Sequence, residues 1–133
     1  MKRIIYILLI SSFILSFFIK DKYVELNNLV IVEGIGLECI DNEYSIHLKE
    51  VIPIKDDSGI EYEYKYYNVK SDDIEKSYDL FDEKISKKIY YNGTKYIITN
   101  CTNTKELIST YNINPKYIIH TNKNIKKELS KHS

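Results

Sequence analysis

The sequence predicts an α+β domain in which a mixed β-sheet packs against two or three helices, preceded by an N-terminal transmembrane or signal helix. Three observations support this prediction: a long uncharged run at the N-terminus, several segments with the two-residue period of strands, and one segment with the period of a helix. Because strands and helices then follow one another along the chain, we expect one mixed sheet with helices packed on it.

The N-terminal run is the strongest single signal. Lys2 and Arg3 precede residues 4–19 (IIYILLISSFILSFFI), which carry no charge, and the charged residues 20–22 follow. A helix with a rise of about 1.5 Å per residue would make this run ~24 Å long, a little short of the roughly 30 Å of a hydrocarbon core. We therefore assign residues 1–20 to a signal-anchor or transmembrane helix rather than to a buried core helix.

The residues around the end of this run indicate that the helix is retained. A cleavable signal needs small residues in an A-x-A-like pattern, and the chain contains no alanine. A lipoprotein signal needs a cysteine directly after the run, but the two cysteines are Cys39 and Cys101. The alternative is a cleaved signal and a secreted domain. Positive charge before the run places the N-terminus in the cytoplasm, so residues 21–133 form one extracytoplasmic domain.

Two strands are predicted directly after the anchor. Residues 29–37 (LVIVEGIGL) are apolar enough for a buried strand, and residues 44–52 alternate between apolar and polar side chains. Asp41 and Asn42 form a turn signal between them, so we expect an antiparallel hairpin. The polar residues 53–59 are expected to form a loop.

A row of tyrosines marks the next predicted strand. Residues 61–69 (EYEYKYYNV) alternate, which places Tyr62, Tyr64 and Tyr66 on one face. Such a row can serve as a stacking platform for sugars or bases. We instead expect the packed face of a strand, because aromatic side chains suit a half-buried pleated surface.

The main helix is predicted over residues 72–88. Ser71 is expected to cap its N-terminus, and the two aspartates that follow suit the positive end of the helix dipole. A stripe with helical spacing should face the core: Ile74, Tyr78, Phe81 and Ile85. The remaining predicted elements are a strand at 95–99, a short helix from Thr102 or Asn103 to about Thr110, a strand at 117–121 and a tail helix at 124–131.

Composition argues against a nucleic-acid partner. The chain carries 19 basic and 19 acidic residues, so no basic surplus is present to bind a phosphate backbone. The excess of Ile, Lys, Asn and Tyr over Ala and Trp is typical of an AT-rich genome, and we expect a bacterial source.

No motif predicts catalysis, a cofactor or a metal. His47, His120 and His132 are isolated, and CxxC, HExxH and phosphate-loop patterns are absent from the sequence. Gly34 and Gly36 lack the third glycine of a dinucleotide fingerprint. We therefore predict that the protein is not an enzyme and has no catalytic, cofactor-binding or metal site.

The two cysteines leave two alternatives. Cys39 and Cys101 belong to the outer domain, where a disulfide can persist. Sequence cannot show that they meet, so a single disulfide and two buried free thiols remain equally open.

The order of the elements resembles a known family. Residues 23–37 place Glu25, Asn27 or Asn28, and Leu29 before an apolar strand that ends in G-I-G. The hairpin then ends in Ile52-Pro53, the segment ISKKIYYNGTKYIIT follows, and an N-P step precedes YIIHT. This series is similar to the N-terminal domain of the Ger(x)C spore germination proteins, and it covers residues 23–129.

The resemblance implies a function. It implies a non-catalytic, membrane-anchored component of a spore germinant-receptor-like complex, which binds or scaffolds other germination receptor subunits on the outer side of the inner membrane. The alternative is an independent extracytoplasmic ligand-binding or adhesion module. The chain departs from the family in two ways: no lipid-accepting cysteine follows the apolar run, and family members continue into further domains. We therefore expect an uncleaved helix in place of a lipid and only the family's first domain.

Overall fold

The computed structural model describes residues 1–132, without the side chains of residues 16–27. Within this part of the chain, four helices and a six-stranded mixed sheet confirm the predicted α+β class. The elements are α1 (Lys2–Asn27), β1 (Leu29–Ile40), β2 (Glu43–Asp56), β3 (Gly59–Ser71), α2 (Ile74–Lys84), β4 (Lys88–Tyr90), β5 (Tyr96–Thr99), α3 (Lys105–Tyr111), β6 (Tyr117–His120) and α4 (Ile125–Lys131).

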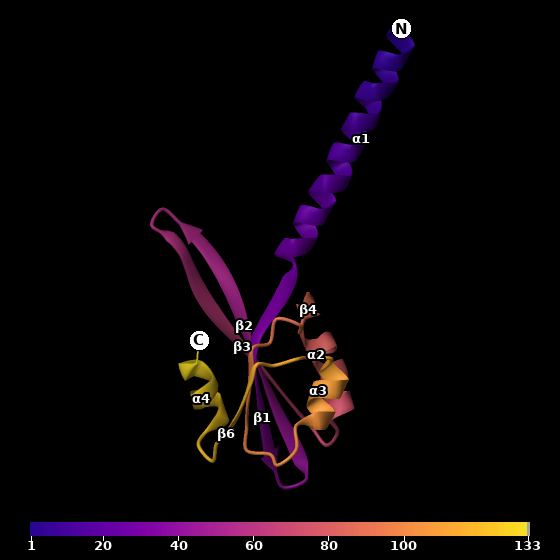
Figure 1. The fold of residues 1–133 in the computed structure, drawn as a ribbon. Coiled ribbons are helices and arrows are strands. Elements are labelled where there is room, and N and C mark those ends of the chain that lie inside the picture. Colours follow the sequence, from indigo (N-terminus) through magenta and orange to yellow (C-terminus); the bar gives the residue numbers. More distant parts are fainter. Residues whose placement is uncertain (133) are drawn as a thin grey trace.

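The sheet lies between two helical layers. Its strand order is β3-β2-β1-β5-β6, and β4 pairs with the first residues of β1. The pairs β1–β2 and β2–β3 are antiparallel, whereas β1–β5 and β5–β6 are parallel. α2 and α3 cover one face, α4 lies on the other, and α1 projects away from the domain (Figure 1).

The alternating side chains of the sheet form two apolar clusters. The larger cluster joins the face of β1, β2 and β5 to α2 and α3, with Phe81 and Leu107 fully buried. The smaller cluster packs Ile125 and Leu129 of α4 against β5. The predicted helix stripe is therefore largely confirmed: Ile74, Phe81 and Ile85 are buried, and Tyr78 is partly buried.

The predicted end and cap of the main helix were wrong. α2 ends at Lys84, and Ile85 leaves it with an extended backbone while remaining buried. The next residues form β4, which pairs in parallel with the start of β1. Asp73, not Ser71, caps the N-terminus: its side chain accepts a hydrogen bond of 3.0 Å from the Glu75 N–H.

The prediction of a loop at residues 53–59 was also wrong. Both strands of the β2–β3 hairpin continue to the pair Asp56–Gly59, so only Asp57 and Ser58 form the turn. Asp56 Oδ1 accepts a hydrogen bond from the Ser58 N–H, and Gly59 has a φ of 133°, which favours glycine. Polar residues are present here because the end of the hairpin projects beyond the helical layers (Figure 1).

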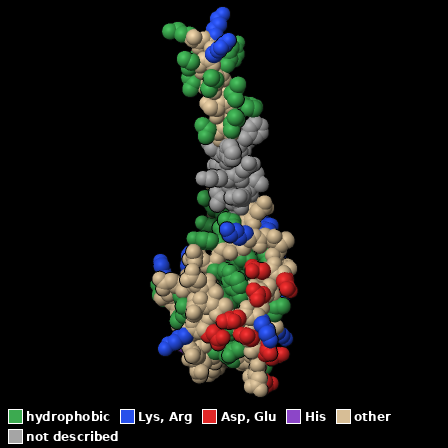
Figure 2. All heavy atoms as spheres, turned by 90° about the vertical axis from the view of Figure 1, so that its right-hand side faces the viewer, with side chains coloured by type: hydrophobic (Ala, Val, Ile, Leu, Met, Phe, Trp, Pro, Cys, Tyr) green, Lys and Arg blue, Asp and Glu red, His purple; other side chains and the backbone are tan. Residues whose placement is uncertain are grey.

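The described apolar side chains of α1 are exposed to solvent. Those at residues 4–15 are half to two-thirds exposed (Figure 2), and Leu9 is 60% exposed. Residues 16–19 of the expected membrane segment lie outside the described side chains. Among the described residues, no helix combines the length and apolarity needed to cross a membrane.

The two cysteines form a disulfide, which resolves the alternatives left by the sequence. Cys39 near the end of β1 is bonded to Cys101 just after β5, with the Cα atoms 5.5 Å apart. The Asn100 side chain supports this junction, since its Oδ1 accepts a hydrogen bond of 2.7 Å from the Cys39 N–H.

Removing this disulfide should destabilise the domain. We expect Cys39→Ser/Cys101→Ser to lower the free energy of unfolding by about 2–5 kcal/mol, the range for a native disulfide of a small domain. Urea titration followed by circular dichroism measures the change. A reductant should shift the unfolding midpoint of the native protein but not that of the variant. Equal midpoints for both proteins without reductant would contradict a bonded pair.

Candidate functional site

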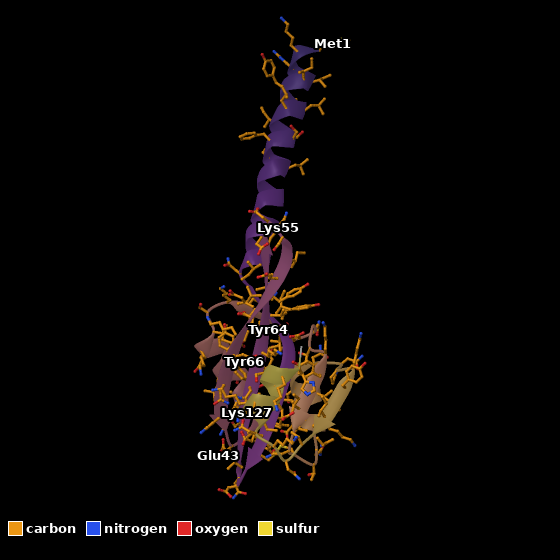
Figure 3. The ribbon with its side chains drawn as sticks, turned by 90° about the vertical axis from the view of Figure 1, so that its left-hand side faces the viewer. Met1, Glu43, Lys55, Tyr64, Tyr66 and Lys127 are labelled. Carbon is orange, nitrogen blue, oxygen red and sulfur yellow. A yellow bond between two sulfur atoms is a disulfide. The ribbon has the colours of Figure 1, made fainter. Side chains whose placement is uncertain are left out.

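The tyrosine row of β3 is exposed, so the expectation of a packed face was wrong. Tyr62 is 58% exposed, and Tyr64 and Tyr66 are both more than one-third exposed. β3 is an edge strand, and α4 packs on β1, β2 and β5, so the row extends beyond the helix that covers this face. Figure 3 shows Tyr64 and Tyr66 along the hairpin, with Lys127 of α4 nearby.

An open pocket lies beside this row, and we call it the tyrosine pocket. Its volume is about 500 Å³, and β1, β2, β3 and the segment before β5 supply its walls. The lining residues are Ile31, Glu33, Val51, Tyr62, Tyr64, Gly93 and Lys95.

Strand register explains how these residues come together. Val51 is paired with Tyr64 across β2 and β3, so both side chains lie on the same face. The β1–β2 register shifts between Val32 and Gly34, which marks Glu33 as the extra residue of a bulge. A bulge redirects a side chain, and here Glu33 lines the pocket although its strand is otherwise largely apolar.

A buried ion pair forms the base of the site. Glu33 is 5% exposed and Lys49 is 0% exposed, and Lys49 Nζ lies 3.9 Å from Glu33 Oε2. The same ammonium lies 4.4 Å from the centre of the Tyr64 ring, which is a cation–π geometry. Burial lowers the pKa of Lys49, and the negative charge of Glu33 opposes that shift.

Lys49 also holds α4 on the sheet. Its Nζ donates hydrogen bonds to Tyr96 Oη at 3.2 Å, to the Leu129 carbonyl at 3.1 Å and to the His132 carbonyl. An ammonium has three N–H donors, so these acceptors use them all. The positive charge also lies at the C-terminal end of α4, where the helix dipole favours a cation.

The carboxylate of Glu33 is less completely satisfied. Within the described residues, its Oε2 is buried and accepts no hydrogen bond. The second nearby cation is Lys95 at the rim, whose Nζ is 4.0 Å from Oε1 and whose side chain is largely exposed. Glu33 therefore has two lysines within 4.0 Å, but its Oε2 keeps unused hydrogen-bond acceptor capacity.

Polar side chains of β1, β2 and β3 surround the ring of His47. Its ring is 3.3–3.4 Å from the Asn68 amide, 3.4 Å from Ser45 Oγ and 3.6 Å from Glu38 Oε2. Burial lowers its pKa, and the hydrogen bond and charge of Glu38 oppose that shift. Among the described residues, no group of three or more His, Cys, Asp or Glu side chains is suited to hold a metal.

The sequence predicted no site residues, and it did not single out Glu33 or Lys49. One signal was present: Glu33 is the only charge in the apolar segment LVIVEGIGL. A carboxylate there requires a buried partner, because an unpaired buried charge is costly. The partner could not be chosen from many lysines without knowledge of the strand register.

The fold and site together define a small disulfide-bonded α+β domain that carries an exposed apolar helix and an open, tyrosine-lined pocket. No protein family model, curated protein or solved structure matches this chain. The resemblance to the Ger(x)C proteins therefore stays a prediction from the sequence.

Proposed function

We propose that the protein is a non-catalytic, membrane-anchored component of a spore germinant-receptor-like complex. The observation that carries the proposal is the exposure of the apolar side chains at residues 4–15 of α1, which precedes a separately packed domain. Side chains such as Leu9 would gain favourable free energy from apolar surroundings, and a contiguous apolar surface of this kind marks an interaction site. The disulfide supports placement of the domain outside the cytoplasm.

The anchor is residues 4–19, with the N-terminus in the cytoplasm and residues 21–133 on the outer side of the inner membrane. Lys2 and Arg3 support this orientation through the positive-inside tendency. The segment is short, and local thinning of the bilayer accommodates such a mismatch at modest cost.

The partners proposed for the outer domain are membrane-embedded germination subunits. The ordered resemblance of residues 23–129 to a family that acts in such complexes supports these partners. Neighbouring genes for a multi-span permease-like subunit and a second germination subunit would support this role. A solitary gene in a bacterium that forms no spores would contradict it. The tyrosine pocket favours the second candidate, an independent extracytoplasmic ligand-binding module.

Orientation and retention are tested together on intact protoplasts. Added protease should digest residues 21–133, and before digestion the chain should remain in the membrane fraction at its full mass of 15.8 kDa. Protection of the domain would contradict the orientation, and a lighter, soluble chain would show that the segment is cleaved.

A single substitution tests the anchor itself. Leu9→Arg should penalise insertion by about 2.5–3.5 kcal/mol, because it places a charge near the centre of the apolar run. Leu9→Ile is the matched control and should fractionate like the native protein. If Leu9→Arg stayed fully membrane-bound, some part of the chain other than this helix would be the anchor.

A further inference from the structure

We propose that the tyrosine pocket binds a neutral, hydroxyl-rich ring, namely a sugar unit. The inference goes beyond the proposed function, because that function requires no small ligand. It depends on three properties of the pocket: the balance of its charges, an unused acceptor and two exposed aromatic side chains.

The charges around the pocket do not favour a charged ligand. Glu33 is the only carboxylate among the lining residues, and Lys49 and Lys95 lie within 3.9 and 4.0 Å of it. A cationic ligand would therefore meet two positive charges for one negative charge. An anionic ligand would have only Lys95, because Lys49 is fully buried and its N–H groups are all used.

Glu33 favours a ligand that donates hydrogen bonds. A buried acceptor without a donor is costly, and Oε2 of Glu33 has none among the described residues. Because Oε2 is itself buried, the Glu33 side chain has to turn toward the pocket to accept from a ligand hydroxyl, and that hydrogen bond would recover part of the cost. Lys95 at the rim can donate to a second ligand oxygen, so the two side chains together suit neighbouring hydroxyl groups.

The aromatic wall suits the apolar face of a sugar ring. Lys49 already covers part of the Tyr64 ring at 4.4 Å, so Tyr62, 58% exposed, offers the more open surface. The C–H groups of a pyranose with equatorial hydroxyls form a flat face that stacks on such a ring. Ile31 and Val51 complete the apolar lining, and about 500 Å³ lies within the range of small-molecule sites.

Saturation-transfer difference NMR on the full chain tests binding directly. The chain is held in a detergent without a sugar headgroup, and the probe is methyl β-D-glucopyranoside at roughly 10 mM, a concentration that detects weak binding. We expect saturation of the ring C–H protons. Tetramethylammonium and acetate should not reduce this signal. Absence of transfer to the sugar, or displacement of the sugar by either ion, would overturn the proposal.

Single substitutions test whether the sugar binds in the tyrosine pocket. Tyr62→Ala should weaken binding by about tenfold through loss of the stacking surface, and its exposure makes the fold insensitive to the change. Tyr117→Ala, at a tyrosine on β6 that is 66% exposed, is the control and should bind like the native protein. If Tyr62→Ala binds with unchanged affinity, the pocket is not the sugar site.

Discussion

Replacing Lys49 with alanine should lower the free energy of unfolding by about 3–5 kcal/mol, because removing one partner leaves the other as an uncompensated buried charge. Glu33 is that partner, and it is buried 3.9 Å from the ammonium. The substitution also removes the ammonium that donates hydrogen bonds to Tyr96 Oη and to the carbonyls of Leu129 and His132. Equilibrium urea unfolding of the full chain measures the loss.

A double variant separates the charge from the packing. Lys49→Met keeps an apolar stem of similar length, and Glu33→Gln removes the charge that would be stranded. We expect Lys49→Met alone to be strongly destabilising and Lys49→Met/Glu33→Gln to be more stable than that single variant, since residues of one ion pair are coupled. A double variant whose loss equals the sum of the two single losses would show that the pair is not coupled.

Phe81→Ala should have a comparable effect through a different cause. Phe81 is fully buried between α2 and the sheet, so truncation removes apolar burial and leaves a cavity. The expected loss is about 3–5 kcal/mol. Thermal or urea unfolding of the full chain measures it.

The neighbouring Leu80 is the matched control for this experiment. It is on the same helix but 37% exposed, so Leu80→Ala removes fewer buried contacts and should cost much less than Phe81→Ala. Similar losses for the two variants would mean that the stripe of α2 does not face the main core.

Local sequence patterns predicted most elements correctly. The β1–β2 hairpin, β6 and α4 each depend on periodicity or on a turn or cap signal within a few residues, such as Asn124, whose side chain accepts a hydrogen bond from the Lys127 N–H. β4 could not be predicted in this way. It is short, and its strand conformation is stabilised by pairing with β1, which is far away in the sequence.

The site depended even more on distant contacts. Alternation correctly placed Tyr62, Tyr64 and Tyr66 on one face, but whether that face is covered depends on where α4 packs. The charge of Glu33 was visible in the sequence, yet its pairing with Lys49 requires the bulge in β1 and the register of β2.

The sequence by itself determined the α+β class, the apolar N-terminal helix, the main hairpin and the helix stripe that faces the core, because side-chain periodicity is a local property of the chain. Only the tertiary structure decided the disulfide, the Glu33–Lys49 pair and the open tyrosine pocket. Each of these brings together residues from separate strands or helices. Whether these residues come into contact depends on strand order and register. Long-range packing determines both, so they cannot be inferred from a local sequence pattern.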